Sequence, residues 1–165
     1  MKNKSRARRS AVLPAANNNL FCLTIAIKNL QKTVPLDPDK IKEIAFKVFQ
    51  REGVEKKAAL SFFFVTDKKI QALNLRYLGE DCPTDVIAFD SSRGEGILAD
   101  IFISTDRAAA QSAVFKTSLL YELYLYLIHG ILHVLGYDDL CSKERALMRK
   151  REKLLLKELN ITRNT

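Results

Sequence analysis

Long apolar segments and a disulfide framework are both missing from this sequence. No apolar run approaches the roughly 20 residues that a membrane-spanning helix requires, and no hydrophobic signal-peptide core follows the basic first residues. The three cysteines, Cys22, Cys82 and Cys141, are odd in number and lack framework spacing, which indicates reduced thiols. We therefore expect a cytoplasmic protein without a membrane partner.

The chain also lacks the length for a second core, and it shows no internal repeat. Its 165 residues suit one domain. The net charge of +8 is concentrated at the ends, because residues 1–10 contain five basic and no acidic side chains and residues 141–165 contain eight basic and three acidic ones. Such ends suit a polyanion such as RNA, although a basic stretch is often only a solvated tail. We predict a basic, disordered tail over residues 1–20, a folded domain over 21–160 and a C-terminal tail over 161–165.

Histidine is scarce, and the two that occur, His129 and His133, lie four residues apart. Leucines and isoleucines recur at three- and four-residue intervals from Thr117 to Leu135, which predicts a helix that is apolar on nearly every face and therefore central and buried. Residues i and i+4 of a helix share one face, so both imidazoles can reach one metal ion. A core histidine with ordinary hydrogen bonds is the alternative, but the pairing favours a metal site.

A third ligand is expected from the turn that follows this helix. Gly136 suits the left-handed position that ends a helix, and Asp138, Asp139 and Cys141 come soon after it. Spacing alone does not choose among these three residues. Three protein ligands would leave the fourth position of a tetrahedral ion open for water, which is typical of catalytic sites.

Strand and helix patterns alternate along the rest of the chain. Asp37 and Pro38 are a typical N-cap and first helical residue. In the last helix, we expect Leu147, Leu154, Leu155 and Leu159 to face inward. Periodicity predicts strands over residues 21–27, 60–66, 85–89 and 97–104, and helices over 36–50, 67–77, 105–112, 117–135 and 142–159. These elements predict a single α+β domain with a roughly four-stranded mixed sheet, about five helices and the histidine-bearing helix buried at its centre.

Three segments resemble the YbeY family of bacterial rRNA maturation endoribonucleases. The run HGILHVLGYDD, residues 129–139, resembles the family signature HGxLHLxGYDH. The run LNLRYLGEDCPTDVIAF, residues 73–89, resembles LNxxYRxxDxPTDVLSF, and Asp100, Ile101 and Ser104 resemble the strand GDIxIS. The likeness extends from about Phe21 to Leu159, and it implies the same α+β fold.

The resemblance implies a zinc ion held by three residues of the signature. In the family all three are histidines, and the third occupies the place of Asp139 here. A carboxylate oxygen binds zinc at nearly the same distance as an imidazole nitrogen. The implied ligands are therefore His129, His133 and Asp139, with one zinc or other divalent ion per chain. The attacking group would be either a water on the metal or the 2′-hydroxyl of the RNA, and no side chain is assigned a catalytic step.

The resemblance further implies a single-strand-specific endoribonuclease that acts in rRNA maturation at the 16S rRNA 3′ end and in ribosome quality control, with the small ribosomal subunit as partner. Candidate RNA contacts are Arg145 and Arg149 in the basic last helix. Arg76 is a third candidate, because Leu78 stands where the family has an arginine, although the two positions lie roughly 200 degrees apart around a helix.

Two carboxylates, Asp85 and Asp100, are candidates for accepting the free ring N–H of a metal-bound histidine, which would fix its tautomer. The simpler alternative for each is to cap a turn or to pair with a lysine.

Two other functions compete with RNA cleavage. A ribosome assembly factor that binds RNA and holds a structural metal is the first, and both Leu78 and Asp139 favour it. A zinc metalloprotease is the second, because its HExxH helix has the same histidine pair. The glutamate that serves such enzymes as general base is replaced here by Gly130, which argues against proteolysis.

Overall fold

The computed structural model describes residues 22–164, and the predicted basic tail over residues 1–20 lies outside them. The described chain alternates strands and helices as predicted. The elements follow in the order β1 (Leu23–Asn29), α1 (Pro38–Arg51), β2 (Ala58–Val65), α2 (Asp67–Leu78), β3 (Val86–Asp90), β4 (Ile97–Ser104), α3 (Thr105–Phe115), α4 (Leu119–Val134) and α5 (Ser142–Glu158). Within the described residues, the prediction of four strands and five helices in one domain is confirmed.

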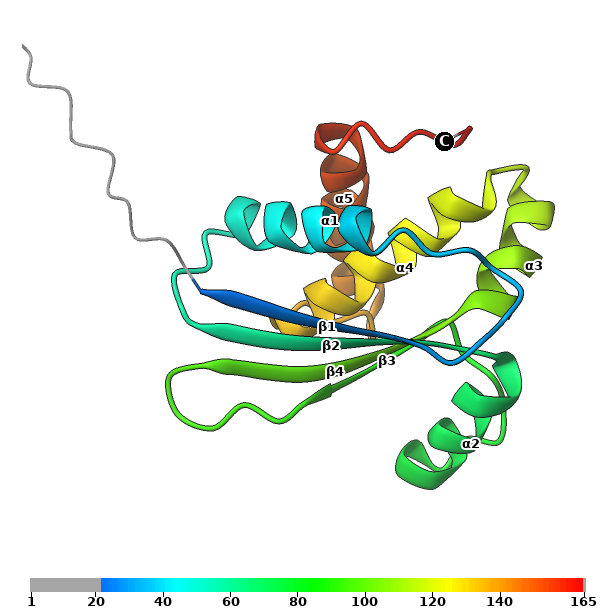
Figure 1. Ribbon diagram of the computed structural model, residues 1–165, viewed down its shortest axis with the longest axis horizontal. Helices are drawn as coiled ribbons and strands as arrows, with labels where there is room; N and C mark the ends of the chain where they lie inside the picture. Colours follow the sequence, from blue (N-terminus) through cyan, green and yellow to red (C-terminus); the bar gives the residue numbers. More distant parts are fainter. Residues whose placement is uncertain (1–21, 165) are drawn as a thin grey trace, which may run out of the picture.

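The four strands form one mixed sheet in the order β1-β2-β4-β3. Strands β1, β2 and β4 run parallel, and β3 pairs antiparallel with β4. Parallel neighbours need long crossover connections, which α1 supplies between β1 and β2, and α2 and β3 supply between β2 and β4. The helices of these two connections, α1 and α2, lie on opposite faces of the sheet (Figure 1).

Helices α1, α4 and α5 lie on one side of the sheet, and α2 lies on the other (Figure 1). Side chains alternate between these faces. Phe62 and Ile101 are fully buried in the main core with α1 and α4. Their strand neighbours Phe63 and Phe102 point to the opposite face, where their rings stack with centroids 4.4 Å apart.

Local sequence signals explain where the helices begin and end. The Asp37 carboxylate accepts hydrogen bonds from the backbone N–H groups of Asp39 and Lys40, with Pro38 at the first helical position. The hydroxyl of Ser118 caps α4 by accepting from the N–H of Tyr121 at 3.0 Å. The cap at Asp37 and Pro38 matches the position expected from the sequence.

The inward face of α5 differs from the predicted one. Leu155 and Leu159 are buried as expected, but Leu147 and Leu154 are 59% and 41% exposed. The buried positions of the helix are Met148, Glu152, Leu155 and Leu156. The helix is thus rotated relative to the expectation, and a charged side chain, Glu152, faces the interior.

The chain beyond α5 packs against the domain. Ile161 is 5% exposed and belongs to the main core. The carbonyl of Arg163 accepts a hydrogen bond from the N–H of Ser118 at 2.7 Å, which joins this segment to the start of α4. The ordered domain therefore continues past residue 160 into the region predicted as a tail. No helix of the described chain combines the length and the apolar character that crossing a membrane requires.

Helix α4 is the buried centre of the fold, and it approaches the sheet most closely at Gly130. A Cβ atom added there would lie 2.6 Å from Cγ2 of Ile101 and 3.0 Å from Cγ1 of Val86. Both methyl groups belong to β-branched side chains, which have little rotamer freedom. The residue that follows His129 is thus fixed as glycine by packing.

We expect Gly130→Ala to destabilise the domain. Overpacking against Ile101 should cost about 1–3 kcal/mol, which exceeds the gain of about 1 kcal/mol from the higher helix propensity of alanine. The free energy of unfolding, measured with urea, checks this. In an Ile101→Ala background, where most of the clash is removed, the same substitution should be neutral or stabilising. Equal destabilisation in both backgrounds would contradict the packing argument.

Candidate metal centre

Helix α4 presents both histidines on one face near its C-terminal end. Their Nε2 atoms are 2.9 Å apart, and the rings stand nearly perpendicular, at 88°. Each residue is partly exposed, whereas the neighbouring Ile131 and Leu132 are fully buried. The pair therefore lies at the edge of the core, where an apolar helix meets solvent.

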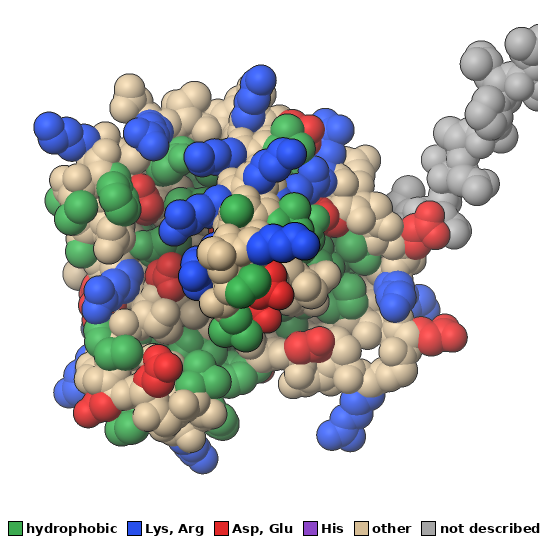
Figure 2. Space-filling view, turned by 180° about the vertical axis from the view of Figure 1, so that it is seen from behind, with side chains coloured by type: hydrophobic (Ala, Val, Ile, Leu, Met, Phe, Trp, Pro, Cys, Tyr) green, Lys and Arg blue, Asp and Glu red, His purple; other side chains and the backbone are tan. Residues whose placement is uncertain are grey.

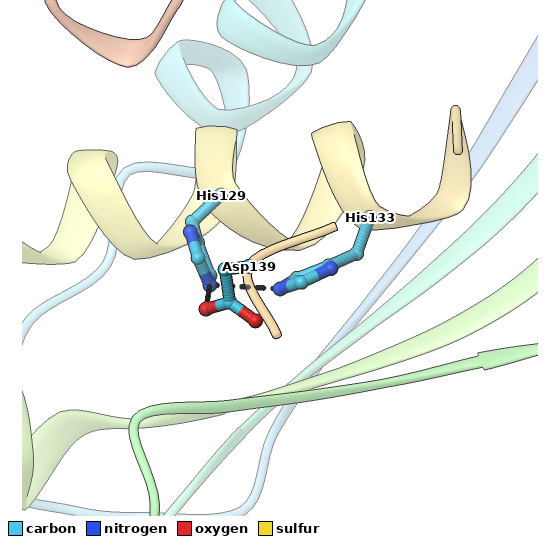
Figure 3. Close-up of side chains that lie close together, drawn as sticks. All are labelled: His129, His133 and Asp139. Carbon is cyan, nitrogen blue, oxygen red and sulfur yellow. Dashed lines mark hydrogen bonds and ion pairs between the residues drawn. The ribbon is translucent and has the colours of Figure 1, made fainter. Parts of the chain in front are cut away.

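The segment after α4 brings Asp139 back to the histidines. The chain turns at Gly136, whose φ of +92° lies in the left-handed region that favours glycine. The Asp139 carboxylate then lies 3.8 Å from His129 Nε2. Figure 3 shows the three side chains converging from α4 and from this loop.

The other two candidates for the third ligand have different roles. Asp138 accepts a hydrogen bond from the N–H of Asp139 at 2.7 Å and so shapes the loop. Cys141 is exposed at the start of α5, where its N–H donates to the Glu144 carboxylate. Neither belongs to the metal-competent group found among the described residues, which consists of His129, His133 and Asp139.

Each histidine has an acceptor on the ring nitrogen that faces away from the cluster. His133 Nδ1 lies 3.1 Å from the carbonyl oxygen of Tyr137, and His129 Nδ1 lies 2.6 Å from Oε1 of Glu152. A carbonyl oxygen can only accept, so His133 Nδ1 carries the hydrogen, and the carboxylate of Glu152 favours the same tautomer for His129. Both Nε2 lone pairs then point at each other across 2.9 Å.

Two facing lone pairs beside a carboxylate repel one another unless a proton or a metal ion lies between them. The ligand atoms of the three residues all lie within 4.8 Å of one another. With zinc ligands at about 2.0–2.2 Å, two ligand atoms on one ion are separated by roughly 3–4 Å, which this group meets with small adjustments. The donor set therefore fits a divalent metal ion.

The charges around the cluster also favour a cation. Burial lowers the pKa of His129, but the hydrogen bond to Glu152 and the negative charges of Glu152, Asp85 and Asp139 act in the opposite direction and prevail. The pKa of His129 is therefore raised from its ordinary value. The same negative charges that stabilise a proton on this ring would attract a metal ion.

Tyr137 connects the cluster to the rest of the domain. Its carbonyl accepts from His133, and its hydroxyl donates to Glu52 at 2.9 Å. Glu52, at the end of α1, also pairs with Arg151 of α5. Three helices thus hold the loop that carries Asp139.

The metal group opens on a cavity of about 760 Å³ between α3, α4 and α5. Basic side chains from three parts of the chain line it. They are Arg107, Arg145, Arg149, Lys153 and Arg163. Lys and Arg side chains gather over the upper and central part of the face opposite the view of Figure 1 (Figure 2).

The predicted RNA contacts divide between this cavity and another surface. Arg145 and Arg149 line the cavity, and Arg145 also donates to the carbonyls of Asp139 and Leu140 at 2.8 and 2.9 Å. Arg76 does not reach it, because α2 packs on the opposite face of the sheet (Figure 1). Its guanidinium instead lies over the ring of Tyr77.

Neither carboxylate predicted to orient a histidine does so. Asp100 points away from α4, because it alternates along β4 with Ala99 and Ile101, which are buried on the α4 side. Asp85 lines the cavity, but its Oδ1 accepts from the Thr84 hydroxyl and the N–H of Val86 at the start of β3. Glu152, which the sequence reasoning missed, takes the predicted role.

We expect Glu152 to act on the metal through His129. Glu152→Gln removes the charge and allows an amide N–H to favour the wrong tautomer of His129, so zinc affinity should fall by about 10- to 100-fold. Zinc affinity is measured by competition with a chromogenic chelator, and urea unfolding checks that the variant is folded. Glu158→Gln on the same helix, whose carboxylate pairs with Arg51, is the matched control. Unchanged zinc affinity in folded Glu152→Gln protein would refute this role.

Comparison with known proteins agrees with the resemblance noted in the sequence. The sequence model of the family described as "Endoribonuclease YbeY" matches residues 26–160. A protein named Endoribonuclease YbeY from Pelotomaculum thermopropionicum is 36% identical over 152 residues, covering 86% of this chain and 100% of the relative. One of the same name from Bacillus velezensis is 34% identical over 158 residues, with the same coverage of both chains.

A solved structure supports the fold. The solution structure of a protein from Thermotoga maritima superposes with a TM-score of 0.59 at 25% identity, covering 82% of this chain and 89% of that one. The family match spans most of the chain and includes the whole metal group together with Glu152. On this evidence the chain belongs to the endoribonuclease YbeY family.

Proposed function

We propose that this protein is a zinc-dependent endoribonuclease that hydrolyses phosphodiester bonds of single-stranded RNA. Its proposed role is rRNA maturation, including the 3′ end of 16S rRNA, and ribosome quality control at the small ribosomal subunit. The observation that carries the proposal is the convergence of two imidazole lone pairs and a carboxylate at one end of a cavity lined by five basic side chains. The family supports RNA as the substrate.

In this proposal, His129, His133 and Asp139 hold the ion. A divalent ion bound there would activate water as a nucleophile near neutral pH and stabilise the charge that develops on the phosphate oxygens. Glu152 and the Tyr137 carbonyl keep the histidine tautomers fixed, and Arg145 holds the carbonyls of the Asp139 loop. The ligands are therefore preorganised by neighbouring side chains from α5 and by the loop itself.

The wall of the cavity formed by α5 suits a polynucleotide backbone. Arg145, Arg149 and Lys153 recur at four-residue intervals, so they form one stripe with a rise of about 6 Å between successive side chains. Evenly spaced cations beside a metal site are typical of surfaces that bind successive phosphates. This stripe would hold the strand while the phosphodiester lies at the metal group.

A metalloprotease is excluded by packing as well as by composition. A general-base glutamate at Gly130 would need space for a side chain, but even a Cβ atom would lie 2.6 Å from Ile101.

An RNA-binding assembly factor with a structural metal is the second candidate. Leu78, at the position of the family arginine, favours it, because this side chain is 61% exposed at the end of α2 and is not part of the cavity lining.

A cleavage assay separates the two candidates. Zinc-loaded protein should cut single-stranded RNA, and His133→Ala should lower the rate by at least 100-fold, because it removes a ligand. Elemental analysis should show one zinc per wild-type chain and loss of zinc in Asp139→Ala but not in Asp138→Ala. Zinc binding without any His133-dependent cleavage would favour the assembly factor. Release of zinc by Asp138→Ala alone would show that the third ligand is assigned wrongly.

We expect Arg149 to contribute to RNA affinity and Arg76 not to. Arg149→Glu should weaken binding of a single-stranded RNA about tenfold or more and flatten the dependence of log affinity on log salt concentration by about one phosphate contact. Arg76→Glu changes the net charge equally but on the far face of the sheet, so it should leave both quantities nearly unchanged. Fluorescence anisotropy at several salt concentrations measures both. Equal effects of the two substitutions would mean that net charge, rather than the cavity, determines RNA affinity.

A further inference from the structure

A buried tyrosine opens on the cavity beside the metal group. Tyr126 precedes His129 by three residues, about 4.5 Å along the helix axis, and it lines the same cavity although it is only 6% exposed. Its hydroxyl makes no hydrogen bond within residues 22–164. This oxygen is not among the enclosed polar atoms that lack a partner, so it is reachable from the cavity and available to a group that enters there.

The charges around this hydroxyl favour a neutral partner over a phosphate. Burial comes first in raising the pKa of Tyr126 far above its ordinary value, followed by the negative charges of Asp85 and Glu122, and Arg107 only partly opposes them. The hydroxyl therefore stays protonated and can donate. With carboxylates outnumbering the guanidinium, a phosphate would be repelled here, whereas a hydroxyl group would not.

An acceptor, Asp85, lines the same cavity, and its charge acts on Tyr126. Its Oδ1 is used by Thr84 and the N–H of Val86, while Oδ2 accepts no hydrogen bond from the described chain. A hydroxyl group that enters the cavity can accept from Tyr126 and donate to Asp85 at the same time. The ribose 2′-hydroxyl has this donor-and-acceptor character, and it is the group that distinguishes RNA from DNA.

We propose that Tyr126 and Asp85 bind the 2′-hydroxyl of one ribose next to the cleaved phosphodiester, and that they thereby select RNA over DNA. This inference rests on the proposed function, since it concerns the substrate of the same site. The phosphates of the strand then lie along the basic stripe of α5, and one sugar faces α4. A nucleobase does not fit the observation as well, because the ring of Tyr126 is buried and offers no face for stacking.

The test combines single 2′-deoxy substitutions in a short RNA with Tyr126→Phe. For the wild-type protein, removing the 2′-hydroxyl at one nucleotide should lower kcat/KM by about three- to tenfold, as expected for one lost hydrogen bond. Tyr126→Phe should lower kcat/KM on the all-RNA substrate by a similar factor and show no further loss at that nucleotide. A 2′-hydroxyl that acts as the nucleophile would behave differently, because its removal would abolish cleavage by both proteins.

Tyr124→Phe is the matched control. Tyr124 lies on the same helix and is 5% exposed, but it is not part of the cavity lining. Burial raises its pKa first, followed by the negative charges of Asp37 and Glu43 at α1. The Tyr124→Phe variant should have the kcat/KM of the wild type and the same sensitivity to 2′-deoxy substitution. The proposal is overturned if Tyr126→Phe retains the full sensitivity to 2′-deoxy substitution, or if it changes the preference for a base instead.

A binding experiment tests the role of Tyr126 even if the protein does not cleave RNA. If the wild type shows no His133-dependent cleavage, affinities for single-stranded RNA and for DNA of the same sequence are compared by anisotropy. Tyr126→Phe should then lower the RNA-to-DNA affinity ratio toward one, with Tyr124→Phe unchanged. An unaltered ratio would overturn the role of Tyr126 independently of catalysis.

Discussion

The close approach of α4 to the sheet at Gly130 is the constraint on which the site depends. Because Ile101 and Val86 leave no space for a Cβ atom, α4 can pack this closely on β3 and β4 only with glycine at position 130. His129 precedes Gly130 and His133 follows it by three residues, so both histidines lie to one side of the helix face that packs on the sheet. Packing energy in the core thus determines the position of two polar side chains that contribute little to the core themselves.

Hydrogen bonding then determines which atoms of these side chains face the cavity. Glu152 and the Tyr137 carbonyl each accept from an Nδ1–H group, so the unprotonated Nε2 atoms point toward one another and toward Asp139. The acceptors come from α5 and from the loop after Gly136, while Glu52 holds Tyr137 in place. The cluster is therefore a product of tertiary structure, even though its ligands are close together in the sequence.

The sequence predicted features that depend on neighbouring residues, such as helix caps. It missed features that depend on which face of a helix is buried and on which face of the sheet a strand side chain lies. The caps at Asp37 and Ser118 were predictable because each signal lies within one helical turn. Glu152 was not, because it lies 23 residues from His129 in a helix whose basic residues mask its buried face. For the same reason Leu147 of this helix was expected to face inward, whereas it is exposed. The predicted role of Asp100 is wrong for a simpler reason. Side chains alternate along β4, so Asp100 lies on the α2 side of the sheet when Ile101 faces α4.

The cavity separates charges in a way that a polynucleotide can use. Its α5 wall carries Arg149 and Lys153, whereas the part of α4 around Tyr126 experiences mainly the negative charges of Asp85 and Glu122. A strand has the complementary arrangement, with anionic phosphates along one edge and neutral sugars and bases beside it. Turning the strand over would bring phosphates toward the carboxylates of Asp85 and Glu122, which repel them. In the proposed complex, the charges of the cavity would therefore favour one orientation of the strand.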